Sequence, residues 1–124
     1  FVNVATGALS ALTRLPYGEL SIDRDVERCA LAAVTEAIAV ARAIGVAVVT
    51  TDPAAPWRRA WEGLPYGFKN SMLQSIEKGS RTEVDVITGA VCSAGRSANI
   101  PTPVNDTLLA AVKGLEHHLA LPPP

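Results

Sequence analysis

Apolar residues recur at intervals of three and four along most of the chain, a spacing that predicts amphipathic helices. Turn-forming residues divide this pattern into successive segments. We expect helices over residues 1–14, 23–44, 53–61, 71–78, 82–91 and 102–119. The pattern therefore predicts an all-α fold, a helical bundle of about five or six helices.

The segment that follows Ser21 or Asp23 has the broadest apolar stripe, and we expect it to be the central helix of the bundle. Gly45 is the residue expected to end it. Glu36 lies off the stripe and is interpreted as part of a solvated face. The run 46–51 favours a strand by residue type, but no second strand pattern exists to pair with it, so we interpret it as an extended connection.

A tight corner between two helical patterns is the most informative stretch of the chain. Asn70 or Ser71 supplies the cap of a short helix, and Gly79 is the permissive residue past its end. Thr82 is the next expected cap, and Asp85 stands three residues later in a variant of the capping box. The sequence therefore predicts two helices joined by a short turn.

Two polar residues, Ser71 and Glu83, stand at the beginnings of these successive helices. With a rise of roughly 1.5 Å per residue, the first helix separates them by about 10 to 12 Å. Side chains at that distance could contact one small ligand. The alternative is capping alone, because serine and glutamate are both common at helix starts.

Length and charge limit the classes of function. The chain has 124 residues, 48% of them hydrophobic, and a net charge of −1, which is enough for one domain with a core. Eleven basic residues are scattered among twelve acidic ones, so neither nucleic acid nor an anionic membrane is an expected partner. No apolar run approaches the length of a membrane span.

The sulfur and imidazole groups do not suggest a metal site. Cys29 and Cys92 both fall within helical patterns and are interpreted as reduced core thiols, which favours a cytoplasmic protein. His117 and His118 are adjacent and lack a neighbouring acid or cysteine cluster, so no metal is expected. A glycine-rich dinucleotide fingerprint is also absent from the sequence.

Aromatic residues gather before the corner. Trp57, Trp61 and Tyr66 could stack on a ligand, but the interpretation that we favour is that they anchor a loop-rich region to the core. Arg58, Arg59 and Lys69 could meet a cofactor phosphate, but the interpretation that we favour is that they are solvated.

The fuller string around the corner resembles a known family. It reads Ser-Met-Leu-Gln-x-Ile-x-x-Gly-x-Arg-Thr-Glu-Val-Asp-x-Ile-x-Gly-Ala-Val from Ser71 to Val91, and Ile-Pro-Thr-Pro-Val-Asn follows at residues 100–105. This resembles the C-terminal domain of ketopantoate reductase (2-dehydropantoate 2-reductase), over nearly the whole chain. The resemblance implies one helical domain at 1–124, similar to the C-terminal domain of 6-phosphogluconate dehydrogenase. Because the chain opens on Phe1 inside a helical pattern, we expect an excised piece that lacks the family's N-terminal Rossmann domain.

The resemblance also implies an activity for the intact protein. In the family, hydride passes from NADPH to the keto group of 2-dehydropantoate and gives pantoate, a step of pantothenate biosynthesis. The Rossmann domain binds the NADPH, so this chain alone is not expected to be active. A homodimer is a possible assembly.

Individual positions match the family's functional residues. Glu83 matches the catalytic acid that helps to position a proton-donating lysine, which the resemblance puts just before Phe1. Ser71 and Asn3 match residues that hydrogen-bond the substrate. Gly7 departs from the family, which has a second asparagine there, and Ser75 stands where the family usually has aspartate.

Two other interpretations stay open. A related reductase of another 2-keto acid is favoured by Gly7, since the amide that would bind the substrate is missing. A non-catalytic helical dimerisation or interaction module would need neither Glu83 nor a cofactor. For Asn3, the plain alternative is an exposed residue near a helix end.

Overall fold

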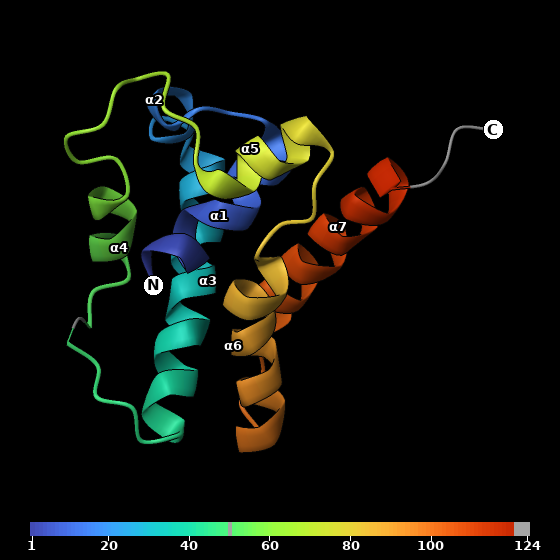
Figure 1. Cartoon of the computed structure of the whole chain (residues 1–124). Helices are drawn as coiled ribbons and strands as arrows, with labels where there is room; N and C mark the ends of the chain where they lie inside the picture. Colours follow the sequence, from blue (N-terminus) through green and yellow to red (C-terminus); the bar gives the residue numbers. More distant parts are fainter. Residues whose placement is uncertain (50, 121–124) are drawn as a thin grey trace.

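The computed structural model describes residues 1–49 and 51–120, and every regular element among them is a helix. The helices pack into one bundle (Figure 1). In chain order they are α1 Val2–Thr13, α2 Tyr17–Leu20, α3 Arg24–Ala43, α4 Ala54–Arg59, α5 Ser71–Lys78, α6 Val84–Ala98 and α7 Pro103–Ala120. The all-α prediction is confirmed, and the seven helices of the described ranges slightly exceed the expected five or six.

The additional helix is α2, which lies between the helices expected at 1–14 and 23–44. Pro16 precedes it in an extended conformation, and the Pro16 carbonyl accepts from the Leu20 amide at 2.9 Å. A helix of four residues is too short to show a periodic pattern, which explains why it was missed. Residues 46–49 form no strand, as expected; residue 50 of the same predicted connection lies outside the described residues.

The buried centre of the bundle is α1 and not α3. All eight residues from Val4 to Ala11 are buried, and α1 contacts α3, α4, α5, α6 and α7. Most of these side chains are small, so the neighbouring helices can approach it closely. The breadth of its apolar stripe had pointed to α3, but a helix that is surrounded on all sides need not carry large apolar residues.

Glu36 is not part of a solvated face, and that interpretation is corrected. Its side chain extends from α3 to the first turn of α7, where the carboxylate accepts from the Val104 and Asn105 backbone amides, both at 2.9 Å. The Asn105 side-chain amide also donates to it, at 2.8 Å. Glu36 therefore caps a helix that begins almost seventy residues later.

Aromatic residues anchor the loop before α5. Trp57 is 2% exposed and lies edge-on to Trp61, with ring centroids 4.5 Å apart. The Tyr17 amide donates to the Phe68 carbonyl at 2.9 Å, which ties this loop to α2. Both tryptophans act as anchors, as predicted, whereas Tyr66 is 64% exposed.

Neither cysteine forms a disulfide among the described residues; Cys92 is buried in the core, as predicted, and Cys29 is half-buried against it. Burial raises the pKa of the Cys92 thiol from 9.0 to about 11, and neighbouring Asp106 adds to the rise. Burial also raises the pKa of the half-buried Cys29, as does the charge of Glu36.

We expect Cys92 to resist thiol reagents at pH 8 until the protein unfolds, while Cys29 reacts slowly. The thiol of the unfolded chain ionises first, so the Cys92 contribution to stability is complete below pH 9.0 and declines as pH rises toward about 11. Ellman titration with and without denaturant measures the first effect, and urea unfolding across this pH range measures the second. Rapid labelling of both thiols in the folded protein would contradict the expectation.

Candidate functional site

The beginning of α5 is built as the sequence predicts. Asn70 is the N-cap, and its side-chain oxygen accepts from the Leu73 amide at 2.9 Å. Gly79 ends the helix in the left-handed conformation with φ of 71°, which glycine adopts without strain. Since Asn70 provides the cap, the Ser71 hydroxyl is not needed for it. Ser71 is exposed at the first position of α5.

The same asparagine connects α5 to α1. Its side-chain amide donates to the Thr6 carbonyl at 3.4 Å, and Met72 packs over the next residue of α1, Gly7. A Cβ atom at Gly7 would lie 2.9 Å from the terminal methyl of Met72. The space next to α1 where the family carries a second asparagine is therefore filled by an apolar group.

Asn3 lies one turn before Gly7 on the same side of α1. It is exposed, and its side chain makes no hydrogen bond within residues 1–49 and 51–120. Its neighbours Phe1 and Val2 line a surface cavity of about 330 Å³ together with residues of α4 and of the connection before it. Asn3 is therefore free to bind a ligand at the beginning of α1.

Glu83 occupies the N-cap position of α6, and its side chain makes no capping hydrogen bond. It is exposed. The predicted capping box does not form: the Thr82 hydroxyl accepts from the Val84 amide at 3.1 Å, and Asp85 pairs with Lys113 of α7. Capping therefore does not account for the Glu83 carboxylate.

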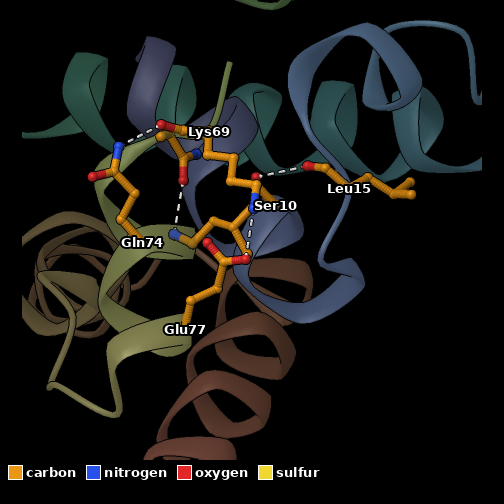
Figure 2. A network of polar contacts seen from close by, with 7 residues as sticks. Ser10, Leu15, Lys69, Gln74 and Glu77 are labelled. Atoms are coloured by element: carbon orange, nitrogen blue, oxygen red, sulfur yellow. Dashed lines mark hydrogen bonds and ion pairs between the residues drawn. The ribbon is translucent and has the colours of Figure 1, made fainter. Parts of the chain in front are cut away.

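The outer face of α5 is held by polar contacts (Figure 2). Lys69 forms an ion pair with Glu77 at 2.8 Å, and the Gln74 side chain donates to the Lys69 carbonyl at 2.7 Å. In the same view, the hydroxyl of Ser10 in α1 donates to the carbonyl of Leu15, two residues after that helix ends. The suggestion that Lys69 meets a cofactor phosphate gains no support, because its charge is already paired.

The three predicted residues thus stand at the beginnings of α1, α5 and α6. α1 packs against both α5 and α6 (Figure 1), but no described hydrogen bond joins the three side chains, and the cavity beside α1 is lined by none of them. Each of the three side chains is open to solvent and can hydrogen-bond a polar ligand, and the carboxylate can also hold an ammonium group.

Three features are absent from the described residues. In the part of the chain that the structure describes, no three His, Cys, Asp or Glu side chains gather as metal ligands. The same part contains no strand, and so it does not form the strand-turn-helix unit that binds a dinucleotide. Among the described helices, none is both long and apolar enough to cross a membrane.

The structure adds two residues of α7 that sequence reasoning missed. Glu116 accepts from the Thr82 amide, and Lys113 pairs with Asp85. Thr82 and Asp85 flank Glu83, and α7 holds the backbone amide of the first and the side chain of the second. These partners lie about thirty residues away along the chain, and a local pattern contains no signal for them.

Comparison with known proteins gives a consistent result. The profile of the family described as Ketopantoate reductase PanE/ApbA C terminal matches residues 1–116. A 2-dehydropantoate 2-reductase of Archaeoglobus fulgidus is 34% identical over 118 residues, which are 95% of this chain and 39% of that protein. The crystal structure of a PanE/ApbA family ketopantoate reductase from Ralstonia eutropha JMP134 has a TM-score of 0.86 at 37% identity, and the match covers 97% of this chain and 40% of that one.

A more distant structure has the same fold. A D-mandelate dehydrogenase, solved with NADH and anilino(oxo)acetate, has a TM-score of 0.86 at 23% identity over 97% of this chain and 40% of that one, which shows the fold alone. The chain spans about two fifths of the length of the relatives that it matches. The resemblance seen in the sequence is confirmed: the chain belongs to the ketopantoate reductase PanE/ApbA C-terminal family.

Proposed function

We propose that this chain is the substrate-binding half of an NADPH-dependent 2-dehydropantoate 2-reductase, an oxidoreductase of pantothenate biosynthesis. The family match at residues 1–116 supports this proposal. Hydride comes from NADPH, which we assign to an N-terminal Rossmann domain outside this chain. We expect residues 1–124 alone to be inactive, and the intact protein could form a homodimer.

The observation that carries the proposal is that three exposed side chains stand at the beginnings of α1, α5 and α6, and α1 packs against both other helices. Asn3 and Ser71 would hydrogen-bond the hydroxyl and the carboxylate oxygens of the substrate. Glu83 would hold the proton-donating lysine upstream of Phe1 next to the oxygen that becomes an alkoxide. The freedom of the Glu83 carboxylate from capping supports this role.

We expect the full-length protein to reduce 2-dehydropantoate with a kcat/KM about tenfold or more above that for simple 2-keto acids, because a site built for the substrate hydroxyl discriminates against analogues that lack it. NADPH oxidation followed by absorbance measures this, with pyruvate and 2-oxobutanoate as the comparison substrates. Equal or faster reduction of the simple acids would exclude the assignment to pantothenate biosynthesis.

A second candidate, a reductase of another 2-keto acid, is supported by Gly7. The asparagine amide that the family has there is absent, and the terminal methyl of Met72 makes the surroundings of Gly7 apolar. The fold is shared with a dehydrogenase of different specificity, so fold alone does not determine the substrate. The same substrate comparison separates the two candidates.

A further inference from the structure

The corner that carries Glu83 is fastened to the last helix of the bundle. The Thr82 amide donates to Glu116 Oε2 at 2.5 Å, and Lys113 Nζ contacts the two carboxylate oxygens of Asp85 at 2.8 and 2.9 Å. Lys113 and Glu116 are three residues apart in α7, so they share one face of that helix. Both contacts therefore come from a single side of α7.

The two contacts are made to residues on either side of Glu83 in the sequence. Glu116 holds the peptide N–H of the preceding residue, and Lys113 holds the side chain of the residue two positions later. The Glu83 side chain has no partner among the described residues, so the position of the backbone sets the region that its carboxylate can reach. A displacement of the corner would move the carboxylate with it.

The contacts differ in strength. The Lys113–Asp85 pair is open to solvent, with side-chain exposures of 50% and 63%, so its expected contribution is small. The Glu116 contact joins a partly buried carboxylate to a backbone amide, which is a charge-assisted hydrogen bond and stronger than a neutral one. On the other side of the corner, Val84 is fully buried and anchors the first turn of α6.

We propose that Glu116 is a positioning residue for Glu83, an inference that rests on the proposed function. By holding the Thr82 amide, its carboxylate keeps the backbone of the corner where the Glu83 carboxylate faces the proton donor and the substrate. α7 thereby takes part in the reaction without touching the reacting atoms.

The first test compares variants of the full-length protein. Glu116→Ala lowers kcat for 2-keto acid reduction about tenfold, because a small misplacement of a catalytic group has a large effect on rate. Glu116→Gln keeps an amide oxygen that accepts from Thr82, and it restores kcat to within about threefold of wild type. Lys113→Ala, the matched control on the same face of α7, stays within about twofold.

The second test asks whether Glu116 acts through Glu83. In a Glu83→Ala background, adding Glu116→Ala causes no further loss of kcat, because the group that it positions is already gone. A purely structural role would lower kcat equally in both backgrounds and would overturn the proposal. So would a Glu116→Ala variant that is as active as Lys113→Ala.

A third measurement separates this proposal from the proposed function. Hydrogen exchange at the Thr82 amide becomes faster in Glu116→Ala and not in Lys113→Ala, and this does not depend on turnover. If wild type reduces 2-keto acids but the Thr82 amide is unchanged, the positioning role fails and the proposed function stands. If wild type reduces no 2-keto acid, both fail.

Discussion

Replacing Glu83 by alanine in the full-length protein is expected to lower kcat for 2-keto acid reduction by about 10²-fold or more. The exposed carboxylate at the beginning of α6 makes no capping bond, so its removal should leave the fold intact. The loss would arise because the proton donor is no longer held beside the developing alkoxide. Steady-state kinetics with saturating NADPH measure it.

Glu62→Ala is the matched control for this experiment. Glu62 is also exposed, and it lies in the loop after α4. Its replacement should leave kcat unchanged, and thermal unfolding of both variants should resemble that of wild type. A Glu83→Ala variant that retains full activity would favour the interpretation of this domain as a dimerisation or interaction module that takes no part in the chemistry.

Glu36→Ala is expected to have the largest effect on stability, a loss of about 3 kcal/mol in the free energy of unfolding. The substitution removes the acceptor of two backbone amides and one side-chain amide at the beginning of α7. These donors lie where the α3 and α7 helices pack, and an unpaired donor there costs more than one exposed to water. Urea unfolding followed by circular dichroism measures the change.

Two variants sharpen this experiment. Glu36→Gln keeps one oxygen but turns an NH₂ group toward a donor, so we expect an intermediate loss. Thr35→Ala is the control, because that exposed side chain bonds only within its own helix, to the Leu31 carbonyl. If Glu36→Ala unfolds at the same urea concentration as Thr35→Ala, the cap contributes nothing measurable.

Local signals in the sequence predicted much of the fold. The bounds of α5 follow from Asn70 and Gly79, which act on residues within one turn of themselves. Asp23 likewise caps α3 by accepting from the amides of Asp25 and Val26. Caps of this kind are visible in sequence because donor and acceptor are a few residues apart.

The errors share the opposite cause, which is a partner far along the chain. The sequence pattern predicts a solvated Glu36 because the residue lies off the apolar stripe. That pattern contains no information on the backbone amides of α7 to which the carboxylate binds. Thr82 and Asp85 have the spacing of a capping box, but Lys113 binds the carboxylate that the box requires. Tertiary contacts override the local preference in both cases.

The candidate site was predicted through resemblance more than through pattern. Spacing alone placed Ser71 and Glu83 at helix beginnings but could not separate a ligand-binding role from capping. The structure weakens the capping explanation for both, since Asn70 caps α5 and the Glu83 side chain caps nothing. The contact of Met72 with Gly7 could not be read from the sequence, because it depends on how α5 lies across α1.

The Glu36 carboxylate accepts mainly from backbone amides at the beginning of α7. This cap therefore depends little on which side chains stand at those positions. At position 104, any residue with an N–H group satisfies it, whereas proline would not. Natural variation should therefore be broad at 104 and narrow at 36, and a saturation mutagenesis library selected for folding should show the same asymmetry.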